Sequence, residues 1–323
     1  PDPISGAARP IPDRATRLSR FTSGHAMEGQ PIIESLLHKR DEIRDGVGGL
    51  VLKELQFDLT LVGPELDAGQ VIGAQLRAPA LREALARTSV KLPAGIVAIT
   101  AGWQEREGEL DALEQHLGQS VRDLRLYERA EAIFDLDREF AEAHRARQNQ
   151  LKEIQEFYRL RLDAAKSAAR ELMAREDGSE SLRRARRSAV AALRRLDAEL
   201  LREIARVHAG FEAAQRTADR PAVAQQRDEM RRLVDEAALV LVAGGHVAVL
   251  LNRLRLFDLP GLLRGKLVAA WSAGAMALSE RIVLFHDRPS QGAGNAEVFE
   301  AGLGLVSGAV FLPDASSRLR LRD

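Results

Sequence analysis

The segment Lys266-Leu-Val-Ala-Ala-Trp-Ser-Ala-Gly-Ala-Met276 joins an apolar run to small, helix-compatible residues, and the pattern changes at Ser272. This change predicts a strand that ends in a tight turn and leads into a helix, with the serine at the turn. Small residues suit such a turn because its strained backbone leaves little room for side chains. Ala270 stands where a G-x-S-x-G motif would place glycine, so residues 270–274 also fit an ordinary strand that ends before a helix.

Two further segments predict strands that end near the same place. Residues 237–246 read Ala-Ala-Leu-Val-Leu-Val-Ala-Gly-Gly-His, a buried strand closed by a glycine pair and followed by an apolar helix through Val249, Leu250 and Leu254. Paired glycines let a backbone approach a ligand and turn N–H groups toward it. Residues 280–287 read Glu-Arg-Ile-Val-Leu-Phe-His-Asp, which predicts another strand with His286 and Asp287 near its end. Together these segments suggest one site.

An earlier strand is predicted at residues 94–100, with a turn over 101–106. Ligands of open α/β sheets bind at the carboxyl ends of strands, so this turn should face the same crevice as Gly244-Gly245 and Ser272. Trp103, Gln104 and Arg106 are therefore candidate substrate contacts. The alternative is a helix N-terminus with exposed charge.

Over residues 94–105 and 236–323 the chain resembles the peptidase E and cyanophycinase-type serine peptidases. The resemblance rests on Gly244-Gly245, on Trp271-Ser-Ala-Gly-Ala275, on Asp287 fifteen residues after the serine, and on Gly302-Leu-Gly-Leu305 leading to Leu312-Pro313. It implies a class I glutamine-amidotransferase-like fold, an α/β three-layer sandwich with a mainly parallel sheet. It also implies Ser272 as nucleophile, Gly245 and Ala273 as oxyanion donors, and Asp287 as an acidic member of the site.

The family's histidine base, usually just after a proline late in the domain, is replaced here by Asp314. A carboxylate is a much weaker base than imidazole at neutral pH, so we expect little turnover. His246 and His286 are alternative bases and candidate substrate contacts. The predicted function is a weak or inactive serine hydrolase acting on a short peptide or small amide, without cofactor or metal.

Residues 139–216 depart most from the family and predict a helical hairpin. Apolar residues repeat every three or four positions in two stripes that can bury each other. The stripes are Leu151, Ile154, Tyr158, Leu162, Ala165, Ala169 and Leu172, then Leu193, Leu196, Leu200, Ile204 and Val207. Arginines of the second helix alternate with acids, which favours a solvated or ion-paired face over nucleic-acid binding. The hairpin could instead serve as a dimerising or partner-binding arm, or as a lid over the crevice. The alternative function for the chain is therefore a non-catalytic ligand-binding or interaction module.

Composition limits the other classes of function. Lys plus Arg and Asp plus Glu both number 47, which gives no global attraction to nucleic acid or anionic membrane. The chain has no cysteine, which excludes thiolate sites and a cysteine nucleophile. No apolar run approaches the length of a membrane span, and a cytoplasmic location is expected. We predict a disordered leader at 1–30, an N-terminal α/β segment of unknown role at 31–92, and a peptidase-E-like domain at 93–323. The family resemblance implies that this domain continues past residue 323.

Overall fold

The computed structural model describes residues 50–52, 59–62, 70–72, 95–176, 178–285 and 296–312. The chain divides between Val47 and Gly48 into two compact units, and all described residues belong to the second. The predicted leader at 1–30 and most of the predicted segment at 31–92 lie outside the described residues.

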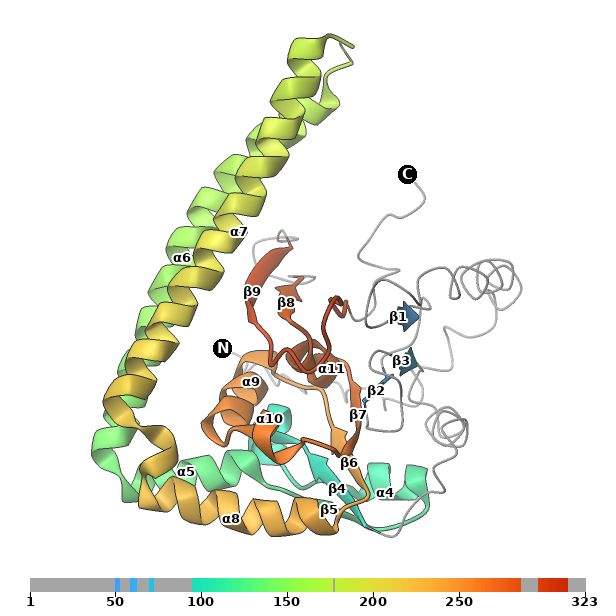
Figure 1. Cartoon of the computed structure of the whole chain (residues 1–323), viewed down its shortest axis with the longest axis vertical. Coiled ribbons are helices and arrows are strands. Elements are labelled where there is room, and N and C mark those ends of the chain that lie inside the picture. The colour runs from blue at the N-terminus through green and yellow to red at the C-terminus, as the bar shows by residue number, and fades with distance from the viewer. Residues whose placement is uncertain are drawn as a thin grey trace, which may run out of the picture. The chain divides into compact units, whose positions relative to one another are not determined.

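A five-stranded sheet in the order β2-β7-β6-β4-β5 forms the centre of the described unit (Figure 1). The strands are β2 (Leu59–Val62), β7 (Leu267–Trp271), β6 (Leu239–Val242), β4 (Ile96–Ile99) and β5 (Val121–Asp123). The last four run parallel, whereas β2 pairs antiparallel with β7 at one edge. The predicted α/β class with a mainly parallel sheet is confirmed at this level. β2 comes from the segment 31–92, so that segment contributes an edge strand to the sheet.

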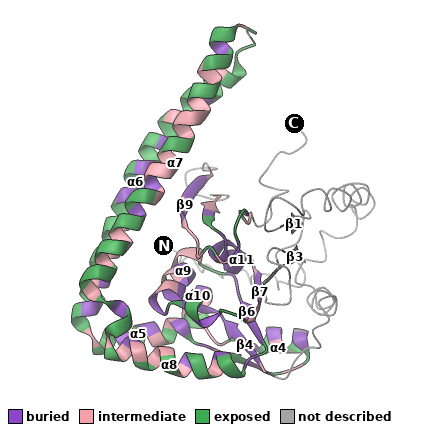
Figure 2. Ribbon diagram, viewed as in Figure 1, coloured by how far each residue is buried: buried purple, intermediate pink, exposed green. Residues whose placement is uncertain are grey.

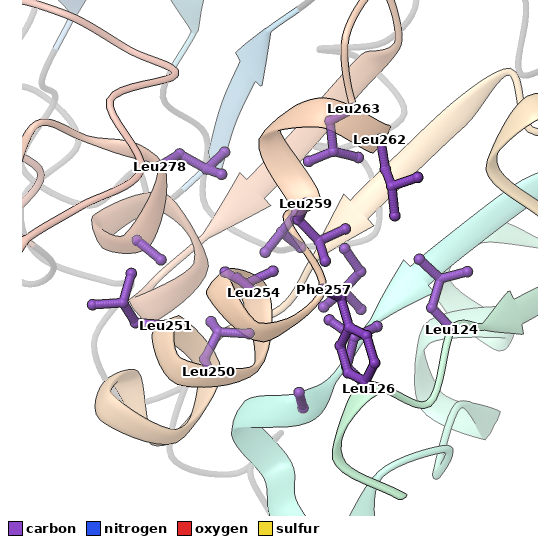
Figure 3. Packing of buried hydrophobic residues seen from close by; sticks show 14 of the residues in the cluster. Leu124, Leu126, Leu250, Leu251, Leu254, Phe257, Leu259, Leu262, Leu263 and Leu278 are labelled. Atoms are coloured by element: carbon purple, nitrogen blue, oxygen red, sulfur yellow. The ribbon is translucent and has the colours of Figure 1, made fainter. Parts of the chain in front are cut away.

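Successive residues of the central strands enter two different apolar clusters. Val97 and Val240 belong to a large cluster with helices α5 (Leu126–Leu136), α9 (Val247–Leu256) and α11 (Ala273–Leu278). Ile96 and Leu239 belong to a smaller cluster with α4 (Asp111–Leu117). This period of two is expected of a sheet that is covered on both faces. Figure 2 shows the resulting buried strands, and Figure 3 shows Phe257 beside Leu126 within the large cluster.

Short helices connect and cover the strands. Their bounds are η1 (Ala101–Arg106), α4 (Asp111–Leu117), α5 (Leu126–Leu136), η2 (Thr217–Asp219), α8 (Pro221–Glu236), α9 (Val247–Leu256), α10 (Leu259–Leu262) and α11 (Ala273–Leu278). Proline begins α8, where its missing N–H costs nothing because the first N–H groups of a helix have no intrahelical partner.

Two small sheets do not pair with the strands of the central sheet. β1 (Leu50–Leu52) pairs parallel with β3 (Gln70–Ile72), and β8 (Arg281–Leu284) pairs antiparallel with β9 (Glu297–Ala301). The strand predicted over 280–287 is present over 281–284, where it pairs with β9 and is not part of the central sheet. His286 and Asp287, which the prediction places near its end, lie outside the described residues.

The predicted hairpin is confirmed as α6 (Arg138–Ala174) and α7 (Glu180–Gln215), of 37 and 36 residues. Figure 1 shows the two helices side by side. Each begins at a side-chain cap: Asp137 accepts from the N–H of Phe140 at 3.0 Å, and Ser179 accepts from that of Leu182 at 3.2 Å. Ile154, Tyr158, Leu162, Leu200 and Ile204 form the seam, as the two stripes predict. Within the ranges that the structure describes, no helix combines the length and apolarity that a bilayer crossing needs.

The hairpin is attached to β9 by polar contacts as well as by packing. Arg159 makes two hydrogen bonds, of 2.8 and 2.9 Å, to the carboxylate of Glu297, whose side chain is only 3% exposed. Gln155 donates to the backbone carbonyl of Val298 at 3.1 Å. A bidentate ion pair with one buried partner fixes the relative orientation of the two side chains, so these contacts fix the position of β9 along α6.

Candidate functional site

Ser272 occupies the turn between β7 and α11, with φ 53° and ψ −127°. A positive φ is unfavourable for any residue with a Cβ and costs about 1–3 kcal/mol when surrounding structure enforces it. Here α11 enforces it, because all six of its residues are buried and the N–H of Met276 donates to the Ser272 carbonyl at 3.1 Å. The predicted strand-to-helix turn at Ser272 is confirmed, and the hydroxyl-bearing residue is half-buried.

The glycine pair after β6 lies directly against this turn. A Cβ placed on Gly244 would be 2.7 Å from Ser272 Cβ and 2.9 Å from Ser272 Oγ. It would also lie 3.3 Å from the amide nitrogen of Ala273. No side chain fits at Gly244, so the serine side chain faces bare backbone there. The prediction that the glycine turn lies beside Ser272 is confirmed.

The turn after β4 packs against the same glycines. Gly245 has φ 114°, and a Cβ there would lie 2.3 Å from the carbonyl oxygen of Gly102. The same carbonyl accepts a hydrogen bond of 2.7 Å from the N–H of His246. Gly244 therefore contacts the serine, while Gly245 contacts the β4 turn. The role of Gly245 as an oxyanion donor stays a prediction.

These three turns meet where the order of the sheet reverses. The chain passes from β4 to β5 on one side and from β6 to β7 on the other, so the switch point lies between β4 and β6. Ligands of open parallel sheets bind outside the carboxyl ends of strands at such a point. Gly102 follows β4 and Gly244 follows β6, which puts the turn of Ser272 beside the switch point.

The predicted substrate contacts of the 101–106 turn have different surroundings. Gln104 has φ 58° and ψ −123°, nearly the backbone conformation of Ser272, and is half-buried. Trp103 packs against the smaller apolar cluster of the sheet, which gives it a structural role. Arg106 is exposed and pairs with Glu109 at 2.6 Å. Of the three, Gln104 is the residue whose strained backbone is typical of a functional position.

The groups available for chemistry at Ser272 follow from these contacts. Ala273 is the first residue of α11, so its N–H precedes the first intrahelical bond and is available to an oxyanion. His246 is exposed and caps α9, with Nδ1 accepting from the N–H of Val249 at 3.3 Å. Among the described residues, none hydrogen-bonds to Ser272 Oγ. The remaining predicted members, His286, Asp287 and Asp314, lie outside the described residues.

An acidic cluster at the ends of β4 and β5 was not anticipated from the sequence. The hydroxyl of Thr100, which is fully buried, donates to Asp123, and the N–H of Gly108 donates to the same hydroxyl at 3.3 Å. Glu107 accepts from the N–H groups of Tyr127 and Glu128 at 3.0 and 2.9 Å.

Burial raises the pKa of Asp123, and burial raises that of Glu107 to about 7. Both carboxyls are held by backbone N–H groups, so we assign them to bracing the 101–108 turn. The sequence gives little indication of this cluster, because Thr100 and Asp123 are 23 residues apart.

No family model, curated protein or solved structure matches the chain. The likeness to the peptidase E group therefore rests on the residues named above.

Proposed function

We propose that the chain is a serine hydrolase of the peptidase E type, with Ser272 as the nucleophile and a short peptide or small amide as the substrate. The proposal includes the glutamine-amidotransferase-like fold that the resemblance implies. It also includes low turnover, because no imidazole stands at the family's position, where Asp314 is found.

The observation that carries the proposal is the backbone of Ser272, at φ 53° and ψ −127° between β7 and α11. A conformation this unfavourable for serine serves to lift the hydroxyl out of the sheet toward a substrate. The N–H of Ala273 and the turn at Gly244 border the same hydroxyl, as an oxyanion site requires. If the turn had only a structural role, glycine at position 272 would adopt this backbone conformation more easily than serine.

Low turnover has a physical reason as well. A serine hydroxyl needs a base within hydrogen-bond reach to lose its proton during attack. Serine enzymes that lack one member of their triad still retain roughly 10³–10⁴-fold catalysis over water through the oxyanion site and binding. We therefore expect slow acylation at Ser272.

A fluorophosphonate probe tests the nucleophile, because it forms a stable bond with activated serines. We expect slow labelling of the full chain that Ser272→Ala abolishes. Ser279→Ala is the matched control, since Ser279 is fully buried and its Oγ lies 2.7 Å from the carbonyl oxygen of Met276. Equal labelling of the unaltered chain and Ser272→Ala would end the proposal.

A second candidate function is a non-catalytic interaction module that works through the helical hairpin. It is favoured by two large apolar side chains on the exposed face of α6, Phe157 and Leu160, which are 55% and 67% exposed. They are three residues apart and so lie on one helix face. If they mediate self-association, the double variant Phe157→Ser, Leu160→Ser shifts a dimer to monomer in analytical ultracentrifugation. A monomeric unaltered chain would contradict self-association.

A further inference from the structure

An open cavity of about 490 Å³ lies between the two hairpin helices, near the start of α6 and the end of α7. Its walls come from α6 and α7 alone and are mainly small or apolar. The lining residues used below are Ala143, Arg147, Gly210 and Phe211. A Cβ placed on Gly210 would meet nothing within 4 Å, so the cavity is open at that wall. Its volume lies in the range of small-molecule sites, about 300–1,000 Å³.

Arg147 is the unusual member of this lining. Its guanidinium carbon lies 4.0 Å from the ring centroid of Phe211, and its Nε is buried without a hydrogen-bond partner. Within the described ranges no carboxylate lies within ion-pair distance of it, although Glu300 and Glu212 are near enough to raise its pKa. Two other arginines near this end of the hairpin have ion-pair partners: Arg220 binds Asp137 at 2.5 Å, and Arg253 binds Glu131 at 2.6 Å, although the Nε of Arg253 is also buried without a hydrogen-bond partner.

Arg147 is half-buried, and a cation that is partly withdrawn from water is costly unless it is paired or hydrogen-bonded. Burial also lowers the pKa of Arg147 to about 10, which leaves the side chain charged at neutral pH. The stacking on Phe211 holds the guanidinium in place without using its N–H groups for hydrogen bonds. The cavity therefore presents a fixed cation at an apolar surface.

We propose that this cavity binds a small amphipathic carboxylate, with the carboxylate on Arg147 and the apolar body against Ala143, Phe211 and the open wall at Gly210. A planar guanidinium matches a carboxylate with two parallel hydrogen bonds. The apolar lining accounts for the rest of the ligand. This site is separate from Ser272 and does not depend on its chemistry.

The test compares 2-naphthoate with 2-naphthylmethanol, a neutral molecule of similar shape, by isothermal titration calorimetry on the full chain. We expect saturable one-to-one binding of naphthoate. Arg147→Met should weaken it about 10- to 100-fold, the usual effect of losing hydrogen bonds to a charged group. The neutral analogue should bind the unaltered chain and Arg147→Met with the same low affinity. Arg145→Met, at an exposed position outside the cavity, is the matched control and should leave naphthoate binding unchanged.

A second variant locates the ligand independently of charge. Gly210→Leu extends a side chain into the open wall and should weaken both probes, whereas Ala209→Leu, outside the lining, should weaken neither. Thermal unfolding of Arg147→Met gives a further readout. Its midpoint should not fall, because the variant removes a half-buried cation that has no ion-pair partner, and naphthoate should no longer raise that midpoint. Absence of saturable binding, or equal naphthoate affinity in Arg147→Met and the unaltered chain, overturns the proposal.

Discussion

Gly244→Ala is the perturbation that addresses the proposed site most sharply. The added methyl carbon would lie 2.7 Å from Ser272 Cβ and 2.9 Å from Ser272 Oγ. Carbon atoms rest about 3.5–4.0 Å apart, so the serine or the glycine turn must move by about 1 Å. The neighbouring backbone resists this movement, since every residue of α11 is buried.

Two effects of different size follow. Crowding of this kind in a packed region costs about 1–3 kcal/mol of unfolding free energy. A displacement of about 1 Å in a reacting group costs roughly 10²-fold in rate. We therefore expect reactivity at Ser272 to fall by about two orders of magnitude while the protein stays folded.

The assay is the rate of fluorophosphonate labelling, measured beside urea unfolding of the same samples. Gly178→Ala is the matched control, because a Cβ at Gly178 would have nothing within 4 Å. It should leave both labelling and stability unchanged. A Gly244→Ala protein that is folded and labels at the unaltered rate would refute the contact between the glycine turn and a reactive serine.

Three further predictions concern charge. Because burial raises the pKa of Glu107 from 4.5 to about 7, the folded protein holds this proton to higher pH than the unfolded chain, and stability should fall as pH rises from 4.5 to 7; Glu107→Gln should remove that fall in urea unfolding. His144 of α6 is buried, and burial lowers its pKa from 6.5 to about 3, so the free energy of unfolding should decrease as pH falls below 6.5. His144→Gln should flatten this decrease, and an unchanged dependence of stability on pH would contradict its origin in His144. Asp314→His should raise peptide hydrolysis about 10²–10⁴-fold if position 314 takes the place of the family's base, whereas no gain would show that the base is elsewhere.

The sequence predicted those parts of the fold that depend on local pattern. The apolar runs before Gly244 and Ser272 end in glycine or small residues, which indicates buried strands and tight turns. The stripes of the hairpin repeat over many turns, so its two helices match the structure within one residue at their outer ends. The turn of Ser272 could be predicted because its requirement for small neighbours is visible in a few residues.

The parts that were not predicted depend on contacts between distant residues. Nothing local in 280–287 says that this strand pairs with β9 instead of joining the parallel sheet. Only the folded chain shows that Gly244 lies against the serine while Gly245 packs against Gly102. The bracing of Thr100 by Asp123 and the unpaired Nε of Arg147 likewise depend on which side chains burial brings together.

The most direct test of the account is an experimental structure of the chain after reaction with a fluorophosphonate. We predict a phosphorus–oxygen bond on Ser272, with the phosphonyl oxygen about 2.7–3.1 Å from the amide nitrogen of Ala273 and from a second amide in the turn of Gly244 and Gly245. An adduct on another residue, or an oxygen on Ser272 that contacts neither amide, would contradict the proposed nucleophile and its oxyanion site.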